Sequence, residues 1–198
     1  MEPVGLNLTN KHVVIIGGGN VAFRRAKRVF SAGASITIVS PECADDMTRW
    51  ISEHSIQWER RKAVPSDTNT FLLILAAGED VHEAIYSWEP GACLINDAAD
   101  SSKGSIVFPA VVQRGQIKAS VHSGGAGPLF AKSLCSKIEP LVAEEAAYVS
   151  FLTAARELVT ASSLSAEKKK AELESLLHPR FRSAELQQHK LAQLRTFS

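Results

Sequence analysis

The sequence is poor in cysteine and has no recognisable metal-binding pattern. Its three cysteines, Cys43, Cys93 and Cys135, are odd in number, lie far apart and form no Cys-x-x-Cys pair. This spacing argues against a disulfide framework and favours reduced, mostly buried thiols. No cluster of histidine and cysteine has the spacing of metal ligands, so we expect no bound metal.

Long hydrophobic runs and an excess of one charge are also absent. The longest apolar run, Phe71 to Ala77, is far too short to cross a bilayer, and no basic segment followed by an apolar stretch occurs at the N-terminus. The 22 basic and 21 acidic side chains give a formal net charge of +1, so no global field attracts nucleic acid or anionic lipid. We therefore expect a cytoplasmic protein without membrane or nucleic-acid partners.

Glycines interrupt the first apolar run in a pattern typical of dinucleotide binding. Residues 13–22 read Val-Val-Ile-Ile-Gly-Gly-Gly-Asn-Val-Ala, which contains the spacing Gly17-x-Gly19-x-x-Ala22. These small residues permit, in order, a tight turn, a close approach to a pyrophosphate, and close packing of the following helix on the sheet. The phosphates would lie at the helix N-terminus, where unpaired N–H groups favour negative charge. The alternative is a tight turn that binds no ligand.

Strand and helix patterns alternate through the first half of the chain. We expect strands over residues 12–16, 35–39, 56–59, 71–76 and 93–96. This alternation predicts an α/β fold with a Rossmann-like parallel sheet and helices on its faces. Asp97 would then follow the last of these strands, at the edge of the sheet where open α/β folds bind their ligands.

The pattern changes after residue 104. Residues 107–112 and 117–121 read as two strands of a hairpin, and the glycine-rich segment 123–128 then leads into a helix. From residue 137 to the end the composition favours helices alone. The chain thus divides into a nucleotide-binding pattern, a short mixed segment and a helical segment.

In this order the segments resemble the precorrin-2 dehydrogenase family, whose members oxidise precorrin-2 to sirohydrochlorin in siroheme synthesis and form the N-terminal half of fused siroheme synthases. The resemblance covers roughly residues 3–140. It rests on residues 13–22 together with Leu6-Asn7-Leu8, Ala32-Gly33-Ala34, Val39-Ser40-Pro41-Glu42, Ala76-Ala77, Ile95-Asn96-Asp97-Ala98, Phe108-Pro109-Ala110-Val111-Val112 and Ser123-Gly124-Gly125 before Pro128.

The chain departs from the family's pattern in three places. Gly78 stands where the family usually has threonine, and Gly127 stands where it usually has serine. The segment from Asp100 to Ser105 also differs from many relatives. The first departure removes a hydroxyl that could contact the cofactor, and the last one leaves the wall of the substrate site undefined.

The resemblance implies a fold in three parts and a set of ligands. The parts are an NAD-binding Rossmann-like domain over residues 1–112, a mixed α/β dimerisation region over 113–143 and a small C-terminal helical domain over 144–198. The implied protein is a stand-alone homodimer that takes precorrin-2 as substrate and NAD as cofactor. No arginine lies beside Ser40 in the sequence to hold a 2′-phosphate, which favours NAD over NADP.

The resemblance also assigns site residues. The implied cofactor contacts are Gly17, Gly19, Asn20, Val21, Ser40, Pro41, Glu42, Ala76 and Ala77. Asp97 matches the family's functional aspartate, expected to act as general base or proton acceptor, and Ser123 is expected to supply a hydroxyl to the substrate. Local sequence leaves open that Asp97 and Ser123 only cap helices.

The substrate's carboxylates require cations, and the sequence does not choose among those available. The candidates are Arg24, Arg25, Lys27, Arg28, Arg114, Lys118 and Lys132. Some members of the family also insert Fe²⁺ into sirohydrochlorin, and that activity is left unassigned for this chain. The alternative from another functional class is a non-catalytic, redox-sensing NAD-binding module.

Overall fold

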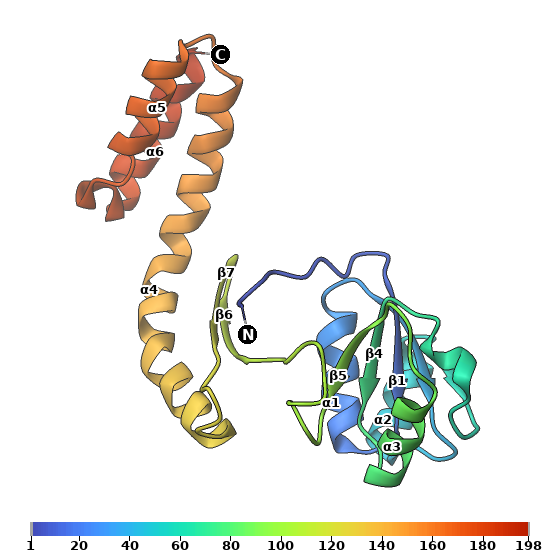
Figure 1. The fold of residues 1–198 in the computed structure, drawn as a ribbon. Helices are drawn as coiled ribbons and strands as arrows, with labels where there is room; N and C mark the ends of the chain where they lie inside the picture. Colours follow the sequence, from blue (N-terminus) through green and yellow to red (C-terminus); the bar gives the residue numbers. More distant parts are fainter. Residues whose placement is uncertain (1, 198) are drawn as a thin grey trace. The chain divides into compact units, whose positions relative to one another are not determined.

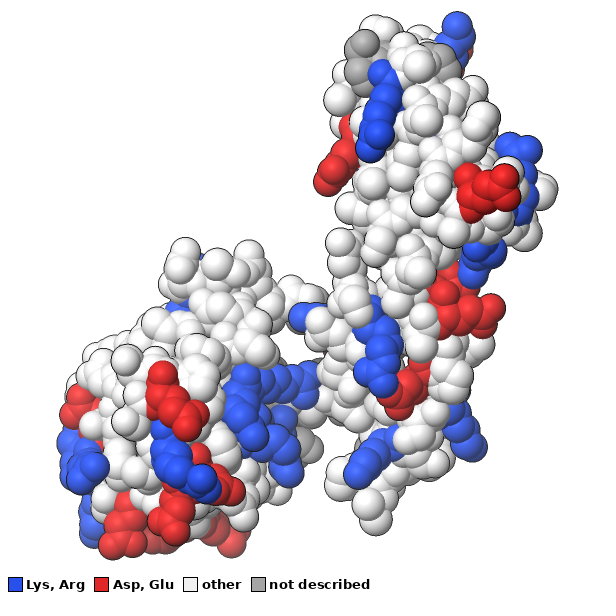
Figure 2. Space-filling model, turned by 180° about the vertical axis from the view of Figure 1, so that it is seen from behind, with Lys and Arg blue, Asp and Glu red and all other residues white. Residues whose placement is uncertain are grey.

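A computed structural model of the chain describes residues 2–197. Within them the chain divides into two units, with the boundary between Phe108 and Pro109. No helix in the described part combines the length and apolarity needed to cross a membrane. On the face shown in Figure 2, each unit carries both basic and acidic side chains, and several basic side chains gather on one side of the first unit.

A five-stranded sheet forms the centre of the first unit (Figure 1). Its strands are β1 (His12–Ile16), β2 (Ser35–Val39), β3 (Gln57–Glu59), β4 (Leu72–Leu75) and β5 (Leu94–Asp97). They lie in the order β3-β2-β1-β4-β5, and every neighbouring pair is parallel. The predicted α/β class and parallel sheet are confirmed. The chain reverses its direction of travel across the sheet between β1 and β4, which is where open α/β sheets bind ligands.

Helices cover both faces of this sheet, because the side chains of each strand alternate between two apolar clusters. The helices of the first unit are α1 (Asn20–Phe30), α2 (Asp45–Glu53), α3 (Glu79–Ser87) and the 3-10 turn η1 (Pro65–Thr68). Val13 and Ile15 of β1 pack in the cluster that contains Ala22 of α1. Val14 and Ile16 pack in the other cluster, with Ile85 of α3. The continuous apolar sequence of β1 is therefore required by burial on both sides.

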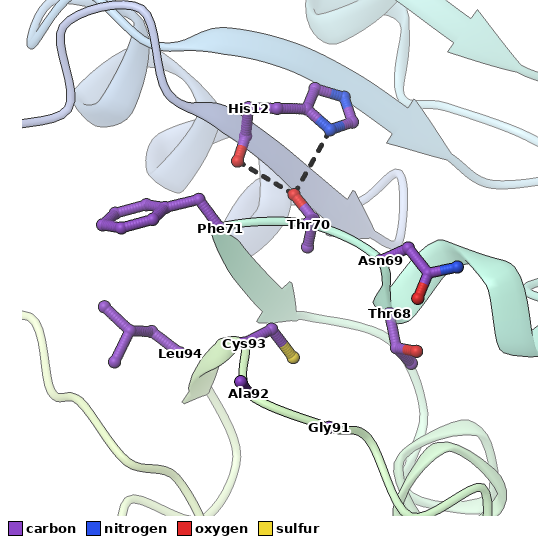
Figure 3. Close-up of a pocket in the computed structure, with 9 residues that line it drawn as sticks. All are labelled: His12, Thr68, Asn69, Thr70, Phe71, Gly91, Ala92, Cys93 and Leu94. Carbon is purple, nitrogen blue, oxygen red and sulfur yellow. Dashed lines mark hydrogen bonds between the residues drawn. The ribbon is translucent and has the colours of Figure 1, made fainter.

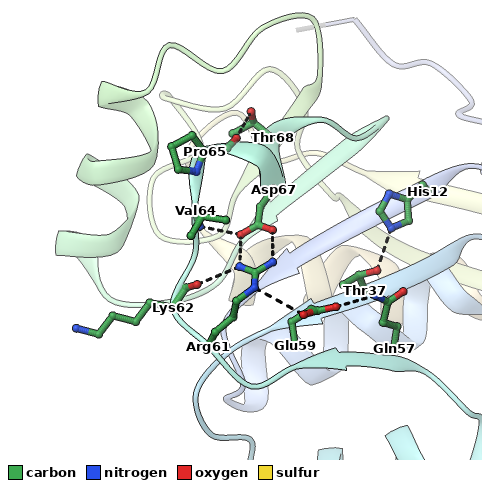
Figure 4. A network of polar contacts seen from close by, with 10 residues as sticks. All are labelled: His12, Thr37, Gln57, Glu59, Arg61, Lys62, Val64, Pro65, Asp67 and Thr68. Carbon is green, nitrogen blue, oxygen red and sulfur yellow. Dashed lines mark hydrogen bonds and ion pairs between the residues drawn. The ribbon is translucent and has the colours of Figure 1, made fainter.

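An ion pair between the buried Asp67 and the partly exposed Arg61 fixes the loop between β3 and η1 (Figure 4). The carboxylate of Asp67 accepts hydrogen bonds from Nη1 and Nη2 of Arg61, at 2.8 and 2.7 Å, and from the N–H of Val64 at 2.8 Å. Burial alone would raise the pKa of Asp67, but these hydrogen bonds outweigh it and hold the pKa below its usual value. The loop is thereby fastened by a carboxylate that must remain ionised.

An open hollow of about 710 Å³ lies at the amino ends of β1, β4 and β5 (Figure 3). Its wall includes His12, Phe71 and Leu94. At this end of the sheet, the hydroxyl of Thr70 donates a hydrogen bond to the His12 carbonyl at 2.9 Å. The hollow is at the opposite edge of the sheet from the glycine loop, which follows the carboxyl end of β1.

The second unit begins with an antiparallel hairpin formed by β6 (Ala110–Arg114) and β7 (Ile117–Val121). The prediction of a first strand over residues 107–112 is therefore wrong at both ends. Pro109 has no N–H to donate, and the strand starts directly after it. The strand continues to Arg114, because the connection is a two-residue turn at Gly115 and Gln116, where Gly115 has a φ of +54°.

Helices make up the rest of the second unit, as the composition predicts. They are α4 (Pro128–Ala161), α5 (Ala166–Ser175) and α6 (Ala184–Leu194), with 3-10 turns η2 (Pro179–Arg182) and η3 (Arg195–Phe197). Helix α4 packs on the hairpin through Cys135 and Val142, and farther along it packs on α5 and α6 through Phe151 and Ala155. It runs without a break past residue 143, where we predict the dimerisation region to end. The three-part division remains a prediction.

The cysteines are free. Cys135 is buried under the hairpin, whereas Cys43 and Cys93 are only partly buried. The expectation of mostly buried thiols is therefore wrong for two of the three. Both exceptions lie in loops of the first unit, where the chain is less deeply covered than in the sheet.

Candidate cofactor and active site

Gly17 makes the tight turn that the fingerprint predicts. Its φ is +121°, a conformation that residues with a side chain rarely adopt. A Cβ atom there would lie 2.4 Å from the carbonyl oxygen of Ala76, at the end of the neighbouring strand β4. The ends of β1 and β4 can therefore approach each other only because this residue is glycine.

Gly18 is required for a reason that the fingerprint does not contain. A Cβ atom there would lie 2.0 Å from the carbonyl oxygen of Glu42 and 2.9 Å from Sγ of Cys43. The carbonyl of Gly18 also accepts a hydrogen bond from the N–H of Ala44 at 2.9 Å. The loop after β2 thus packs directly on the middle glycine. The run of three glycines in the sequence is the only signal that could have indicated this contact.

Gly19 borders open space and directly precedes the first turn of α1. It is the N-cap of this helix in an extended conformation, and no atom would lie within 4 Å of a Cβ added to it. No side chain caps the helix, and its first turn contains no acidic residue. Asn20 and Val21, the first two residues of α1, are exposed. The first-turn N–H groups therefore have the surroundings that favour an anionic group.

The turn after β2 is shaped by the buried hydroxyl of Ser40. This hydroxyl donates a hydrogen bond to the Glu42 carbonyl at 2.6 Å, and the Ser40 carbonyl accepts one from Nε1 of Trp58 at 2.9 Å. Pro41 and Glu42 are exposed at the rim. Ser40 thus contributes to the site through the shape of the loop, while the side chain of Glu42 remains accessible.

The segment after β4 carries the paired alanines and the first departure from the family's pattern. The N–H of Ala76 donates to the carbonyl of Ile16 at 2.9 Å, which keeps the end of β4 beside β1. The N–H of Ala77 donates to Nε2 of His82 at 3.2 Å. Gly78 is the N-cap of α3 in an extended conformation. A Cβ at Gly78 would meet only the end of the flexible side chain of Asp80, at 2.7 Å, so the backbone does not demand glycine there.

Asp97 ends β5 and is almost wholly buried, with 1% of its side chain exposed. Its Oδ1 accepts hydrogen bonds from the N–H groups of Ala99 and Asp100, both at 2.9 Å, and lies 3.2 Å from Nδ1 of His82. Its Oδ2 accepts a hydrogen bond from the hydroxyl of Tyr86 at 3.2 Å. Burial, followed by the charge of Asp97, raises the pKa of Tyr86 to about 12.

The backbone bonds show that Asp97 holds the turn that follows it, but no helix begins there, so the alternative that Asp97 caps a helix is wrong. These backbone bonds leave the carboxylate able to accept further hydrogen bonds, because each of its oxygens offers two lone pairs. His82 and Tyr86 were missed by the sequence analysis. The signal that could have indicated them is their spacing of four residues between two expected strands, because a helix in this segment places both on one face.

Ser123 belongs to the second unit, in the turn between β7 and α4. Its hydroxyl donates a hydrogen bond to the carbonyl of Gly127 at 3.3 Å. Gly127 has a φ of +96° and open space around it. A serine at position 127 would be strained in this conformation, so the departure from the family's pattern has a conformational reason here.

Strand register brings the residues of the first unit to one edge of the sheet. Ile16 pairs with Leu75, and Leu75 pairs with Asp97, so β1, β4 and β5 end at the same level. The glycine loop, the paired alanines and Asp97 follow or occupy these three ends. Among residues 2–197, no group of three His, Cys, Asp or Glu side chains is placed to hold a metal ion.

Two family models match the chain. One, described as putative NAD(P)-binding, matches residues 4–110, and the other, described as SirC C-terminal domain, matches residues 146–191. A solved structure described as SirC, precorrin-2 dehydrogenase, superposes with a TM-score of 0.86 at 27% identity and covers 100% of both chains.

Curated relatives agree with these matches. Precorrin-2 dehydrogenase of Bacillus subtilis is 35% identical over 144 residues, which is 72% of this chain and 89% of that protein. Precorrin-2 dehydrogenase of Priestia megaterium is 27% identical over 196 residues, covering 98% of this chain and 97% of the relative. Siroheme synthase 3 of Aeromonas hydrophila is 30% identical over 179 residues, but the match covers only 38% of that longer protein.

Proposed function

The chain belongs to the precorrin-2 dehydrogenase family, and from this premise we propose that it oxidises precorrin-2 to sirohydrochlorin with NAD⁺ in siroheme biosynthesis. A hydride and a proton leave the substrate, and the hydride passes to NAD⁺. The observation that carries the proposal is the open, uncapped N-terminus of α1 beside Gly19, at the same sheet edge as the buried carboxylate of Asp97.

The residues at this edge fit a dinucleotide. When bound, NAD supplies the hydride-accepting nicotinamide. We assign the pyrophosphate to Gly17, Gly19, Asn20 and Val21, because small residues and free N–H groups meet there. We assign the adenosine ribose to the rim of the loop formed by Ser40, Pro41 and Glu42. Ala76 and Ala77 line the approach from the end of β4, where the absence of large side chains leaves room for a ring.

We assign proton transfer to Asp97, through its Oδ2 atom. Oδ1 already faces three donors, whereas Oδ2 receives a hydrogen bond from Tyr86 alone among residues 2–197. Oδ2 therefore has a lone pair left for a proton from the substrate. We assign to Ser123 a hydroxyl contact with the substrate.

Arg25 is the candidate cation best suited to a substrate carboxylate. Its guanidinium lies 4.8 Å from the ring centroid of Phe108, and that of Arg28 lies 4.9 Å from the same ring. Nε of Arg25 is buried without a hydrogen-bond partner among the described residues. Burial, followed by repulsion from Arg28 and Arg24, lowers the pKa of Arg25 to about 10. A carboxylate bound here would relieve both the repulsion and the missing hydrogen bond.

We also propose that the chain acts as a cytoplasmic homodimer without nucleic-acid or membrane partners. Support for self-association comes from large hydrophobic side chains exposed on the second unit, at Val111, Leu129, Phe130 and Leu141. Analytical ultracentrifugation tests this part of the proposal, because a monomer at micromolar concentration contradicts it.

The activity is tested by anaerobic absorbance spectroscopy with precorrin-2 and NAD⁺. We expect the wild type to form sirohydrochlorin only when NAD⁺ is present, and Asp97→Asn to lose turnover while it still binds NADH. If the folded wild type binds NADH but forms no product, the dehydrogenase proposal fails and the redox-sensing module replaces it.

A further inference from the structure

Two aromatic side chains of α3 connect the separate parts of the proposed site. His82 and Tyr86 are four residues apart, so they project from the same side of the helix. His82 is 3% exposed, and Tyr86 is partly buried. The His82 ring contacts both Ala77, in the segment after β4, and Asp97, at the end of β5.

The hydrogen bond from Ala77 determines which nitrogen of His82 carries the proton. The N–H of Ala77 donates to Nε2 over 3.2 Å, so Nε2 must present a lone pair. The ring proton is therefore on Nδ1, which lies 3.2 Å from Oδ1 of Asp97. With the proton there, the imidazole bridges a backbone donor and a carboxylate acceptor.

The contacts of Asp97 are distributed unequally between its two oxygens. Oδ1 faces two backbone N–H groups and Nδ1 of His82, whereas the hydroxyl of Tyr86 is directed at Oδ2. This arrangement permits one orientation of the carboxylate and leaves the remaining capacity on Oδ2.

We propose that His82 and Tyr86 are positioning residues for the oxidation, an inference that rests on the proposed function. Through Nε2, His82 holds the Ala77 segment, which lines the cofactor site, and through Nδ1 it orients the carboxylate of Asp97. Tyr86 fixes the orientation of Oδ2. The physical reason is that a displacement of about 1 Å between reacting groups can reduce a rate by about 10²-fold.

The two contacts of His82 can be removed separately. In His82→Asn, the amide nitrogen can take the place of Nδ1 beside Asp97, but no acceptor remains for Ala77. In His82→Gln, the amide oxygen can take the place of Nε2 and accept from Ala77, but no donor remains beside Asp97. The measurements are kcat for sirohydrochlorin formation and, without substrate, the Kd of NADH by fluorescence titration.

We expect one His82 variant to change the Kd of NADH and the other to change kcat. His82→Asn should raise the Kd of NADH roughly five- to tenfold and leave kcat within about twofold, as the loss of one hydrogen bond predicts. His82→Gln should lower kcat roughly tenfold and leave the Kd of NADH within about twofold. Parallel losses in both variants, or no change in either, would overturn the inference, because a purely structural histidine has no reason to separate the two quantities.

A control and a second variant complete the test. His54→Gln, at the C-cap of α2, replaces a histidine whose Nδ1 lies 3.0 Å from the Trp50 carbonyl oxygen, and it should change neither quantity. If both His82 variants fail to fold, Tyr86→Phe decides: a lower kcat with unchanged NADH binding supports the inference, and an unchanged kcat overturns it. Failure of the proposed function would be distinct, because the wild type itself would then form no sirohydrochlorin.

Discussion

The glycine loop predicts opposite effects for Gly17→Ala and Gly19→Ala, and Gly19→Ala is the more informative substitution. The added methyl group meets no protein atom within 4 Å. Alanine is a poorer N-cap than glycine, but it also reduces the entropy of the unfolded chain, so we expect the free energy of unfolding to change by less than about 1 kcal/mol. The methyl group would instead occupy the space through which a pyrophosphate approaches the backbone. We expect the Kd of NADH to rise at least about tenfold, which corresponds to about 1.4 kcal/mol.

Gly17→Ala is the matched contrast, because its cost arises within the protein. A positive φ costs a residue with a side chain about 1–3 kcal/mol. The Cβ atom would also lie 2.4 Å from a backbone oxygen of β4, which cannot rotate away, and overpacking of this kind costs about 1–3 kcal/mol more. We therefore expect a loss of about 2–6 kcal/mol in the free energy of unfolding, the sum of these two costs.

The assay is a pair of titrations on each purified variant. Urea unfolding followed by tryptophan fluorescence gives the free energy of unfolding, and NADH fluorescence gives the Kd. The expected result is that Gly19→Ala changes mainly the Kd of NADH, whereas Gly17→Ala lowers the free energy of unfolding. If Gly19→Ala binds NADH with the affinity of the wild type, the assignment of the pyrophosphate to the N-terminus of α1 is wrong.

Three further predictions concern the substrate, the loop before β4 and the helical part of the second unit. Arg25→Gln should raise the KM for precorrin-2 roughly tenfold through loss of a charge-assisted hydrogen bond, and an unchanged KM would refute its assignment. Asp67→Asn should lower the free energy of unfolding by about 1–3 kcal/mol near neutral pH. Folding lowers the pKa of Asp67, so the contribution of this carboxylate to the free energy of unfolding is complete above the usual pKa of 3.8 and disappears as the pH falls through the folded-state pKa. The difference between wild type and variant should therefore shrink in acid unfolding curves. A pH-independent difference would contradict this reasoning. Tyr148→Phe should cost about 1–3 kcal/mol, since the buried hydroxyl donates to the Leu176 carbonyl, and a thermal melt like that of the wild type would show that this bond is dispensable.

The sequence predicted most of what depends on local pattern. The bounds of β1 and β2 agree with the prediction because both strands are rich in β-branched residues and are followed directly by turn-forming residues, Gly17 after β1 and Ser40-Pro41 after β2. The turn at Gly17 could be predicted because the fingerprint encodes the conformation of its own backbone. The position of Asp97 at a strand end followed from the same alternation of strands and helices.

Contacts between distant segments could not be predicted in this way. Gly18 is required by the loop of Glu42, and nothing in the fingerprint encodes that loop's path. His82 is important through Ala77 and Asp97, which come from different strand ends, so its own neighbours in sequence give no indication of its role. The composition does not show that α4 changes packing partners along its length, from the hairpin to α5 and α6.

The most direct test of the account is an experimentally determined structure of the protein with NAD⁺ bound. We predict pyrophosphate oxygens within about 3.2 Å of the N–H groups in the first turn of α1, with the nicotinamide toward Ala77 and Asp97. A dinucleotide bound instead in the hollow lined by His12, Phe71 and Leu94, at the opposite edge of the sheet, would contradict the account.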